Sequence, residues 1–217
     1  MFDAIRNTLL AEAISSPQLL TDLAGLERYI AESYSARVLI ELLQNSDDAN
    51  ANRFTAFVSE NMVIIANDGN PFTDNDFELL CRSAASNKKR GTTIGYRGIG
   101  FKSVVGLARE VFVISGPLSA CFSRERTQKA LSVVTEVPLI RIPHPITDED
   151  WTAIEAPLTA IKAKGFNTIF LFRGLSLGAF NSEVEAFDAQ TALFLNCVRE
   201  LSLQSETIAL EITSTLK

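Results

Sequence analysis

The amino-acid sequence predicts an α+β fold, a two-layer α/β sandwich in which helices cover one face of a mixed, mostly antiparallel sheet. Apolar residues first recur at helical spacing near the start of the chain. Short apolar runs then follow in pairs, joined by turn signals and separated by further helical segments. No repeat, low-complexity segment or linker-like composition interrupts the chain, so residues 1–217 are expected to form a single domain.

Two amphipathic helices are expected near the start of the chain. Residues 17–33 begin with Pro17 after Ser16, an arrangement typical of a first helical position that follows an N-cap. Residues 35–50 form the second helix, which is strongly apolar on one side. Residues 1–16 carry acidic side chains and lack a long apolar run, so they do not look like a secretory signal.

The first strand pair is expected at residues 53–59 and 62–66, because both runs are apolar and Glu60-Asn61 between them predicts a tight hairpin turn. The single histidine, His144, lies between two prolines, a context that suits an exposed turn better than a catalytic base. The other elements are expected at 74–85 and about 99–108 (helices), 110–115 and 119–124 (strands joined at Gly116-Pro117), 126–134 and 148–164 (helices), 167–173 (strand), 182–202 (long helix) and 207–213 (strand).

Composition narrows the function classes. Lys and Arg number 20 against 26 Asp and Glu, a net charge of -6, which disfavours nucleic acid as a partner. The three cysteines lie far apart and form no CxxC pair, which disfavours a zinc site or a disulfide framework and suits a reducing cytoplasm. No stretch approaches the roughly 18 uncharged apolar residues of a membrane span, so no membrane association is expected.

The first group of candidate functional residues lies on the helix expected at 35–50. Glu41, Asn45 and Asp48 are spaced i, i+4 and i+7, so they share one helical face. An Asn oxygen is a suitable ligand for Mg²⁺, and a Glu one turn away can orient a water molecule. Alone, the pattern is more typical of a solvated polar stripe.

Two further groups contain glycine. Asn67, Asp68 and Gly69 directly follow an apolar strand, where a side-chain oxygen can accept from the amine of adenine; a plain turn is the commoner explanation. In GYRGIGFKS, from Gly95 to Ser103, three glycines open a helix whose free N–H groups favour a phosphate. This spacing matches neither the P-loop nor the GxGxxG fingerprint, so a flexible glycine-rich cap is a fair alternative.

Thr168, in the strand NTIFL, is a fourth candidate because its hydroxyl group could meet a base ring, although most strand threonines only fill the sheet. In this order, ELLQNSDDA, NDG, GYRGIGFKS and TIFL together resemble the GHKL ATPase family, which includes DNA gyrase, heat-shock ATPase chaperones, histidine kinases and MutL. The phrases LLQNSDDA, NDGNPFT, SNKKR, IGYRGIGFKSV and TALFLNCVREL are most similar to the heat-shock-chaperone branch and its sacsin-like and NO VEIN-like modules.

The resemblance implies the Bergerat fold, with ATP and Mg²⁺ bound between sheet and helices. It implies Glu41 as the general base, Asn45 as the Mg²⁺ ligand, Asp48 as a contact through water, and Thr168 as an adenine contact. It also implies an ATP lid at about 84–97. The implied phosphate-binding residues are Lys88, Gly95, Arg97, Gly98, Ile99, Gly100 and Phe101, with Lys89 and Arg90 near them.

The chain departs from the family pattern at the adenine site. The usual Asp aligns with Asn67 and the second glycine of the box is Pro71, so the sequence leaves open whether Asn67 or Asp68 contacts adenine. Family members often also use a cation from a second domain against the γ-phosphate, and 217 residues leave no room for one. The chain is therefore expected to be the N-terminal part of a longer protein.

The function expected from the resemblance is slow, Mg²⁺-dependent ATP hydrolysis that drives a conformational switch, with ATP and ADP as ligands. A homodimer formed through the lid or through C-terminal regions, and an unknown protein client, are the expected partners. The alternatives are a nucleotide sensor that does not hydrolyse ATP, a histidine kinase and a purely structural interaction domain. The kinase is disfavoured because the single histidine lies between two prolines and because such kinases usually lack a Glu at the place of Glu41.

Overall fold

The computed structural model describes residues 2–34, 38–82 and 108–213. The chain begins with three helices, α1 (Phe2–Ser15), α2 (Pro17–Tyr34) and α3 (Val38–Asp48). The two expected helices are thus confirmed, whereas α1 was not predicted. The apolar pattern that would predict α1 is weak, because this helix buries just two residues, Leu9 and Ala13, which lie one turn apart.

The predicted hairpin is confirmed in strands β1 (Arg53–Ser59) and β2 (Met62–Asn67). Glu60 and Asn61, the two residues between the strands, have φ of 50° and 61°. Two successive positive φ angles are the signature of the type I′ turn, whose twist matches that of a two-stranded antiparallel ribbon.

Most of the middle of the chain also follows the predicted order. Gly116, with φ of 55°, turns the chain between the paired strands β3 and β4. Of the predicted helix at about 99–108, only Ala108 belongs to the described residues, and it is not helical. The elements of this part are α4 (Asp74–Cys81), β3 (Glu110–Ser115), β4 (Leu118–Ser123), α6 (Arg124–Leu131), α7 (Asp148–Ala163) and β5 (Thr168–Arg173).

The long helix predicted at 182–202 is wrong. This part of the chain forms α8 (Leu177–Glu185), a 3-10 helix η1 (Ala189–Phe194) and strand β6 (Glu200–Gln204), followed by β7 (Ala209–Thr213). Leu201 and Leu203 alternate into the core, which is strand spacing. Strand β6 pairs in parallel with β1. Pairing with this distant strand therefore outweighs the local helix propensity of residues 200–204.

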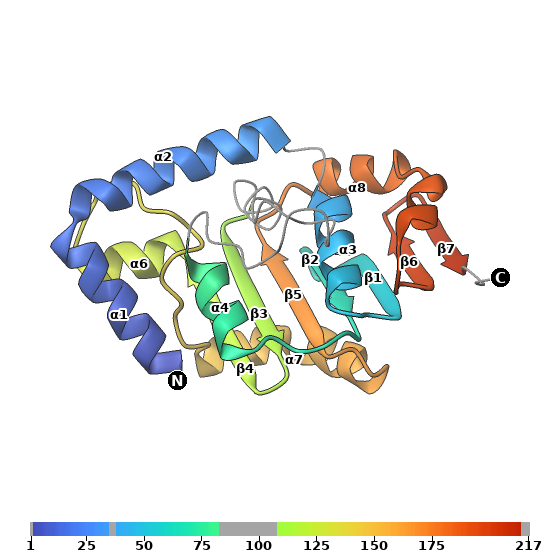
Figure 1. The fold of residues 1–217 in the computed structure, drawn as a ribbon, viewed down its shortest axis with the longest axis horizontal. Coiled ribbons are helices and arrows are strands. Elements are labelled where there is room, and N and C mark those ends of the chain that lie inside the picture. Colours follow the sequence, from blue (N-terminus) through green and yellow to red (C-terminus); the bar gives the residue numbers. More distant parts are fainter. Residues whose placement is uncertain (1, 35–37, 83–107, 214–217) are drawn as a thin grey trace.

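The seven strands form one sheet in the order β4-β3-β5-β2-β1-β6-β7 (Figure 1). Among the strands of residues 2–34, 38–82 and 108–213, only the β1–β6 pair is parallel, and the other pairs are antiparallel. The predicted mixed, mostly antiparallel sheet and the two-layer α+β arrangement are confirmed.

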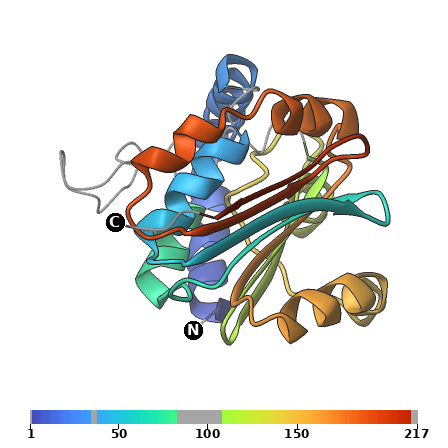
Figure 2. The ribbon, with the colours of Figure 1, turned by 90° about the vertical axis from the view of Figure 1, so that its right-hand side faces the viewer.

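Helices cover the sheet mainly on one side, where α1, α3, α4 and α8 contribute to the larger apolar core. Helix α7 covers the opposite side of the sheet (Figure 2). It packs there through Ile154, Leu158 and Ile161. All six residues of β2 are buried. A continuous apolar run of this kind is typical of a strand covered on both faces, and MVIIA carried that signal.

His144 does not lie in an exposed turn, so that prediction is wrong. Only 4% of its surface is exposed, its backbone forms a bridge with Cys121 on β4, and its Nε2 lies 2.9 Å from the hydroxyl group of Thr127. Burial, together with nearby Arg6 and Arg126, lowers the pKa of His144 to about 4. The imidazole is therefore a neutral core group, which removes the support for a histidine kinase with this residue as phosphoacceptor.

The three cysteines are free thiols. None of the helices in residues 2–34, 38–82 and 108–213 combines the length and the apolar character needed to span a bilayer.

Candidate functional site

Three polar residues form a row at one end of the central strands. Asn67 ends β2, Ser115 ends β3 and Thr168 begins β5, and Thr168 is the register partner of both others. Alternate strand residues face the same side. The row therefore shares its side with Ile65 and Phe170, which belong to the core beneath α3.

The row is deeply buried and internally bonded. Ser115, Thr168 and Asn67 expose 0%, 2% and 4% of their surfaces. The hydroxyl oxygens of Ser115 and Thr168 are 2.6 Å apart, and the backbone N–H of Phe72 donates to Ser115 at 2.8 Å. The sequence analysis missed Ser115; the signal available was a serine that closes an apolar strand just before a Gly-Pro turn.

The Asn67 side chain retains capacity for a ligand. Its Oδ1 accepts from the N–H of Gly69 at 3.1 Å, and a carboxamide oxygen has a second lone pair. Its NH₂ group supplies two donors. A carboxamide can thus accept from the amine of adenine while it donates to a ring nitrogen, as Asn side chains do when they read adenine in DNA.

Asp68 has a different task. One carboxylate oxygen accepts from the backbone N–H groups of Asn52 and Arg53, and the other accepts from the Arg53 Nε, all at 2.8 Å. Burial opposes ionisation of Asp68, but the hydrogen bonds from the Arg53 backbone and guanidinium, with that of Asn52, hold its pKa below the ordinary value. Asp68 fixes the start of β1, and both of its oxygens are used in doing so.

Gly69 allows a close approach of the chain to itself. A Cβ atom here would lie 2.8 Å from the carbonyl oxygen of Ala49 and 3.0 Å from the backbone nitrogen of Ala51. The next residue, Asn70, donates its N–H to the same Ala49 oxygen at 2.8 Å. The turn after β2 is therefore pressed against the end of α3, which brings this helix to the polar row.

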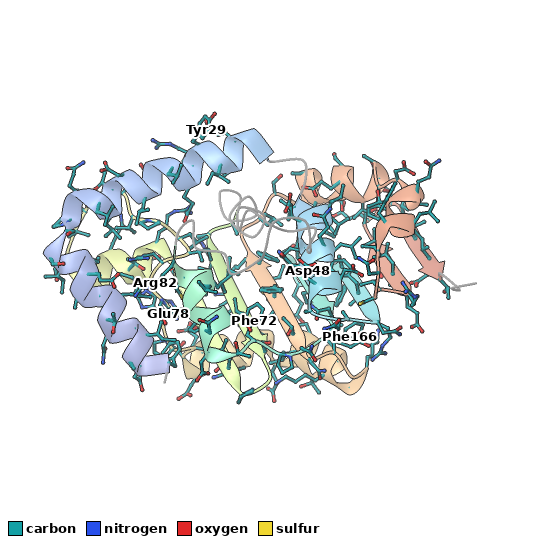
Figure 3. All side chains as sticks on the ribbon, viewed as in Figure 1. Tyr29, Asp48, Phe72, Glu78, Arg82 and Phe166 are labelled. Carbon is teal, nitrogen blue, oxygen red and sulfur yellow. The ribbon has the colours of Figure 1, made fainter. Side chains whose placement is uncertain are left out.

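The three predicted residues of α3 form a half-buried stripe. Glu41, Asn45 and Asp48 have intermediate exposure, while their apolar neighbours Leu42 and Leu43 are buried. Figure 3 labels Asp48 on α3. Such a stripe differs from the fully exposed face expected of a solvated surface, and it suits the rim of a ligand site.

Two carboxylates that the sequence analysis missed hold α3 in place. Asp47, next to the predicted Asp48, accepts from the backbone N–H groups of Cys197 and Val198 at 2.7 and 2.9 Å. Glu183 of α8 accepts from the N–H of Leu39 at 2.8 Å. Sequence offered no signal for either bond, because their partners are about 150 residues away.

The phosphate side of the predicted site lies outside the described residues. This applies to the lid at 84–97 and to Lys88, Gly95, Arg97, Gly98, Ile99, Gly100 and Phe101. Their assignment stays a prediction.

Among the described residues, no cluster of three or more His, Cys, Asp or Glu side chains is placed to hold a metal ion. The donor chemistry of α3 fits Mg²⁺ in another way. This ion is usually held by one or two carboxylates together with substrate phosphates and water molecules, and the Asn45 carboxamide on the half-buried stripe would add a neutral oxygen donor to such a shell.

No protein-family model matches the chain, and no curated protein matches it. Among solved structures, the chain is similar to the N-terminal domain of a DNA repair protein, with 16% sequence identity and a TM-score of 0.46. The match covers 88% of this chain and 56% of that chain, so the present chain spans little more than half of its length.

Proposed function

We propose that this chain is an ATP-binding module of the GHKL type that hydrolyses ATP slowly in the presence of Mg²⁺ and switches conformation with the bound nucleotide. The observation that carries the proposal is that the polar row and the polar stripe of α3 belong to the same side of the sheet and that the end of α3 is joined to the turn after β2. The row Asn67, Ser115 and Thr168 ends the central strands, and the Ala49–Asn70 hydrogen bond ties α3, with its half-buried Glu41 and Asn45, to the same end.

Each residue has a task in this proposal. The Asn67 carboxamide pairs with the edge of adenine, and the Thr168 hydroxyl group adds a hydrogen bond directly or through water. The Asn45 oxygen holds Mg²⁺, which when bound neutralises phosphate charge. Glu41 accepts a proton from water while the water oxygen bonds to the γ-phosphorus, the bond to the bridging oxygen breaks, and ADP leaves with inorganic phosphate as the second product.

The test of binding is thermal unfolding with ATP and Mg²⁺. A ligand at a hundred times its Kd stabilises the folded state by about 3 kcal/mol, so the melting temperature should rise by several degrees. GTP should have a smaller effect, because its ring presents an oxygen where adenine carries the amine. An unchanged melting temperature with ATP at millimolar concentration would contradict the proposal.

The test of catalysis is phosphate release by variants of the α3 stripe. Glu41→Ala should lower kcat by about 10²- to 10⁴-fold, the usual contribution of a general base, and leave ATP binding in place. Asn45→Ala should abolish the phosphate release that Mg²⁺ supports. Glu155→Ala on the exposed side of α7 is the matched control and should change neither quantity.

A nucleotide sensor without hydrolysis is the second candidate, and the neutral Asn67 at the adenine position favours it. This candidate predicts equal thermal stabilisation by ATP and by a non-hydrolysable analogue, with no phosphate release. Release that disappears in Asn45→Ala would exclude it.

A further inference from the structure

Helix α3 is held at its N-terminal end by a residue of α8. The first N–H groups of a helix have no partner within the helix, and they carry its positive dipole end. Here the carboxylate of Glu183 accepts from the backbone N–H of Leu39 at 2.8 Å. Glu183 thus acts as an N-cap supplied by an element that lies far along the chain.

At the other end of α3 the roles are exchanged, because here the helix supplies the carboxylate and the distant segment supplies the N–H groups. Asp47, only 3% exposed, lies in the last turn of α3. Its two oxygens accept from the backbone N–H groups of Asn196, Cys197 and Val198, at 2.7 to 2.9 Å. These three residues lead directly into β6, which pairs with β1 beside α3.

Both contacts join α3 to one continuous segment, residues 177–204. One carboxylate, Glu183, comes from the segment and accepts from one backbone N–H of α3. The other, Asp47, comes from α3 and accepts from three backbone N–H groups of the segment. Glu41 and Asn45 lie between the two anchored ends, so a shift of the segment would carry both side chains with it. An error of about 1 Å in the position of catalytic groups can lower a rate a hundredfold.

We propose that Glu183 and Asp47 are positioning residues, which clamp α3 between α8 and the start of β6 so that Glu41 and Asn45 are held in register with the polar row. This inference rests on the proposed ATPase function.

The test compares Glu183→Ala with Glu183→Gln in ATP hydrolysis at saturating Mg²⁺. Alanine removes the acceptor, and kcat should fall by roughly ten- to a hundredfold, with a smaller change in KM. Glutamine keeps an acceptor oxygen and should restore kcat to within about twofold. In hydrogen exchange, the N–H group of Leu39 should lose protection in Glu183→Ala and keep it in Glu183→Gln.

Asp47→Asn gives a graded second variant, because it keeps one acceptor oxygen and places an NH₂ group against the Asn196 N–H. Asp47→Asn should lower kcat less than Asp47→Ala. If an alanine variant does not fold, the comparison of Asp47→Asn with the wild type serves as the test. Glu155→Ala is the control for the loss of a carboxylate elsewhere.

The outcomes separate the two proposals. If the wild-type protein shows neither stabilisation by ATP nor phosphate release, the proposed function is wrong and the positioning role falls with it. If the wild-type protein hydrolyses ATP and a folded Glu183→Ala retains its kcat, the clamp is overturned while the ATPase stands. The same holds if Glu183→Gln is as impaired as Glu183→Ala.

Discussion

The two faces of the central strands differ most at the strand ends. On the α3 side, β2, β3 and β5 present Asn67, Ser115 and Thr168. On the α7 side, the adjacent residues of the same strands are Ala66, Ile114 and Ile169, which all belong to the apolar cluster beneath α7. All six residues expose 4% of their surface or less. Equal burial is therefore combined with opposite chemistry.

The requirement for a stable fold does not explain why polar residues occupy the strand ends on the α3 side. Burial of a polar group costs free energy unless it is hydrogen-bonded, and an apolar residue would fill the same volume without that requirement. At this end of the strands the α7 face is apolar, so the backbone does not demand polar residues here. The opposite end of the same face does carry charge, because Glu110 and Arg173 form a salt bridge there. Departures from apolar burial are expected at functional sites, which supports the α3 face as the ligand side.

The largest effect should come from the apolar face. Ile154, fully buried on α7, packs against the central strands, and Ile154→Ala should lower the free energy of unfolding by about 2 to 5 kcal/mol through lost burial and a cavity. Chemical denaturation measures this loss. ATP affinity, measured well below the melting temperature, should not change; a parallel loss of affinity would erase the distinction between the faces.

The pH dependence should come from the edge of the same apolar face. The unfolded chain binds a proton on His144 near pH 6.5, whereas in the folded state burial first, and then Arg6 and Arg126, lower its pKa to about 4. Stability therefore falls as the pH drops from about 7 to about 4, by a total of about 3 kcal/mol. Urea denaturation at several pH values should show this slope.

His144→Gln is the variant that isolates this effect, and it should flatten the slope between pH 7 and 4. Glu183 acts in the opposite direction, because burial raises its pKa and the folded state takes up its proton first as the pH falls. An unchanged slope in His144→Gln would show that other groups govern acid stability.

On the polar face, the next effect should be on affinity. Asn67→Leu keeps a similar volume but removes the carboxamide, and it should weaken ATP binding by about 1 to 3 kcal/mol, roughly five- to a hundredfold. Asn67→Asp keeps the acceptor for Gly69 and should bind ATP at least as tightly, because a charged acceptor is stronger. Calorimetric titration of both variants measures the difference. Equal affinity of Asn67→Leu and the wild type would exclude Asn67 from the site.

The smallest and sharpest comparison uses two adjacent residues. Thr168→Val on the polar face removes one hydroxyl group bonded to Ser115 and should cost about 1 kcal/mol in both stability and ATP affinity. Ile169→Val on the apolar face removes one methylene group and should cost about 1 kcal/mol in stability alone. Titration and denaturation of both variants decide whether the two faces differ in function.

Predictions of secondary structure succeeded where local interactions determine the conformation and failed where partners distant in the sequence determine it. Glu60-Asn61 set the β1–β2 turn through local φ preferences, and apolar spacing identified α2, α3 and α7. The helix predicted at 182–202 failed because two remote partners determine that segment. Asp47 binds its backbone N–H groups, and β1 takes up β6 in parallel.

The residues of the candidate site also fall into those that local sequence patterns identified and those that depend on distant partners. The spacing of Glu41, Asn45 and Asp48 and the positions of Asn67 and Thr168 were readable, because helix and strand periods are local properties. The different roles of the neighbouring residues Asp47 and Asp48 could not be predicted from the sequence. Asp47 and Asp48 differ in the sequence only by one position, yet one is an anchor for residues 196–198 and the other lies on the half-buried stripe.

By itself, the sequence determined the order of most helices and strands, the mixed sheet and the polar residues worth testing, since periodicity and turn preferences act over a few residues. Only the tertiary structure decided that Asp68 and Gly69 serve the chain's own packing, that His144 is buried, that Ser115 completes a polar row, and that Glu183 caps α3. Each of these depends on a partner that is distant in the sequence, and burial or hydrogen bonding with such a partner exists only once the chain has folded.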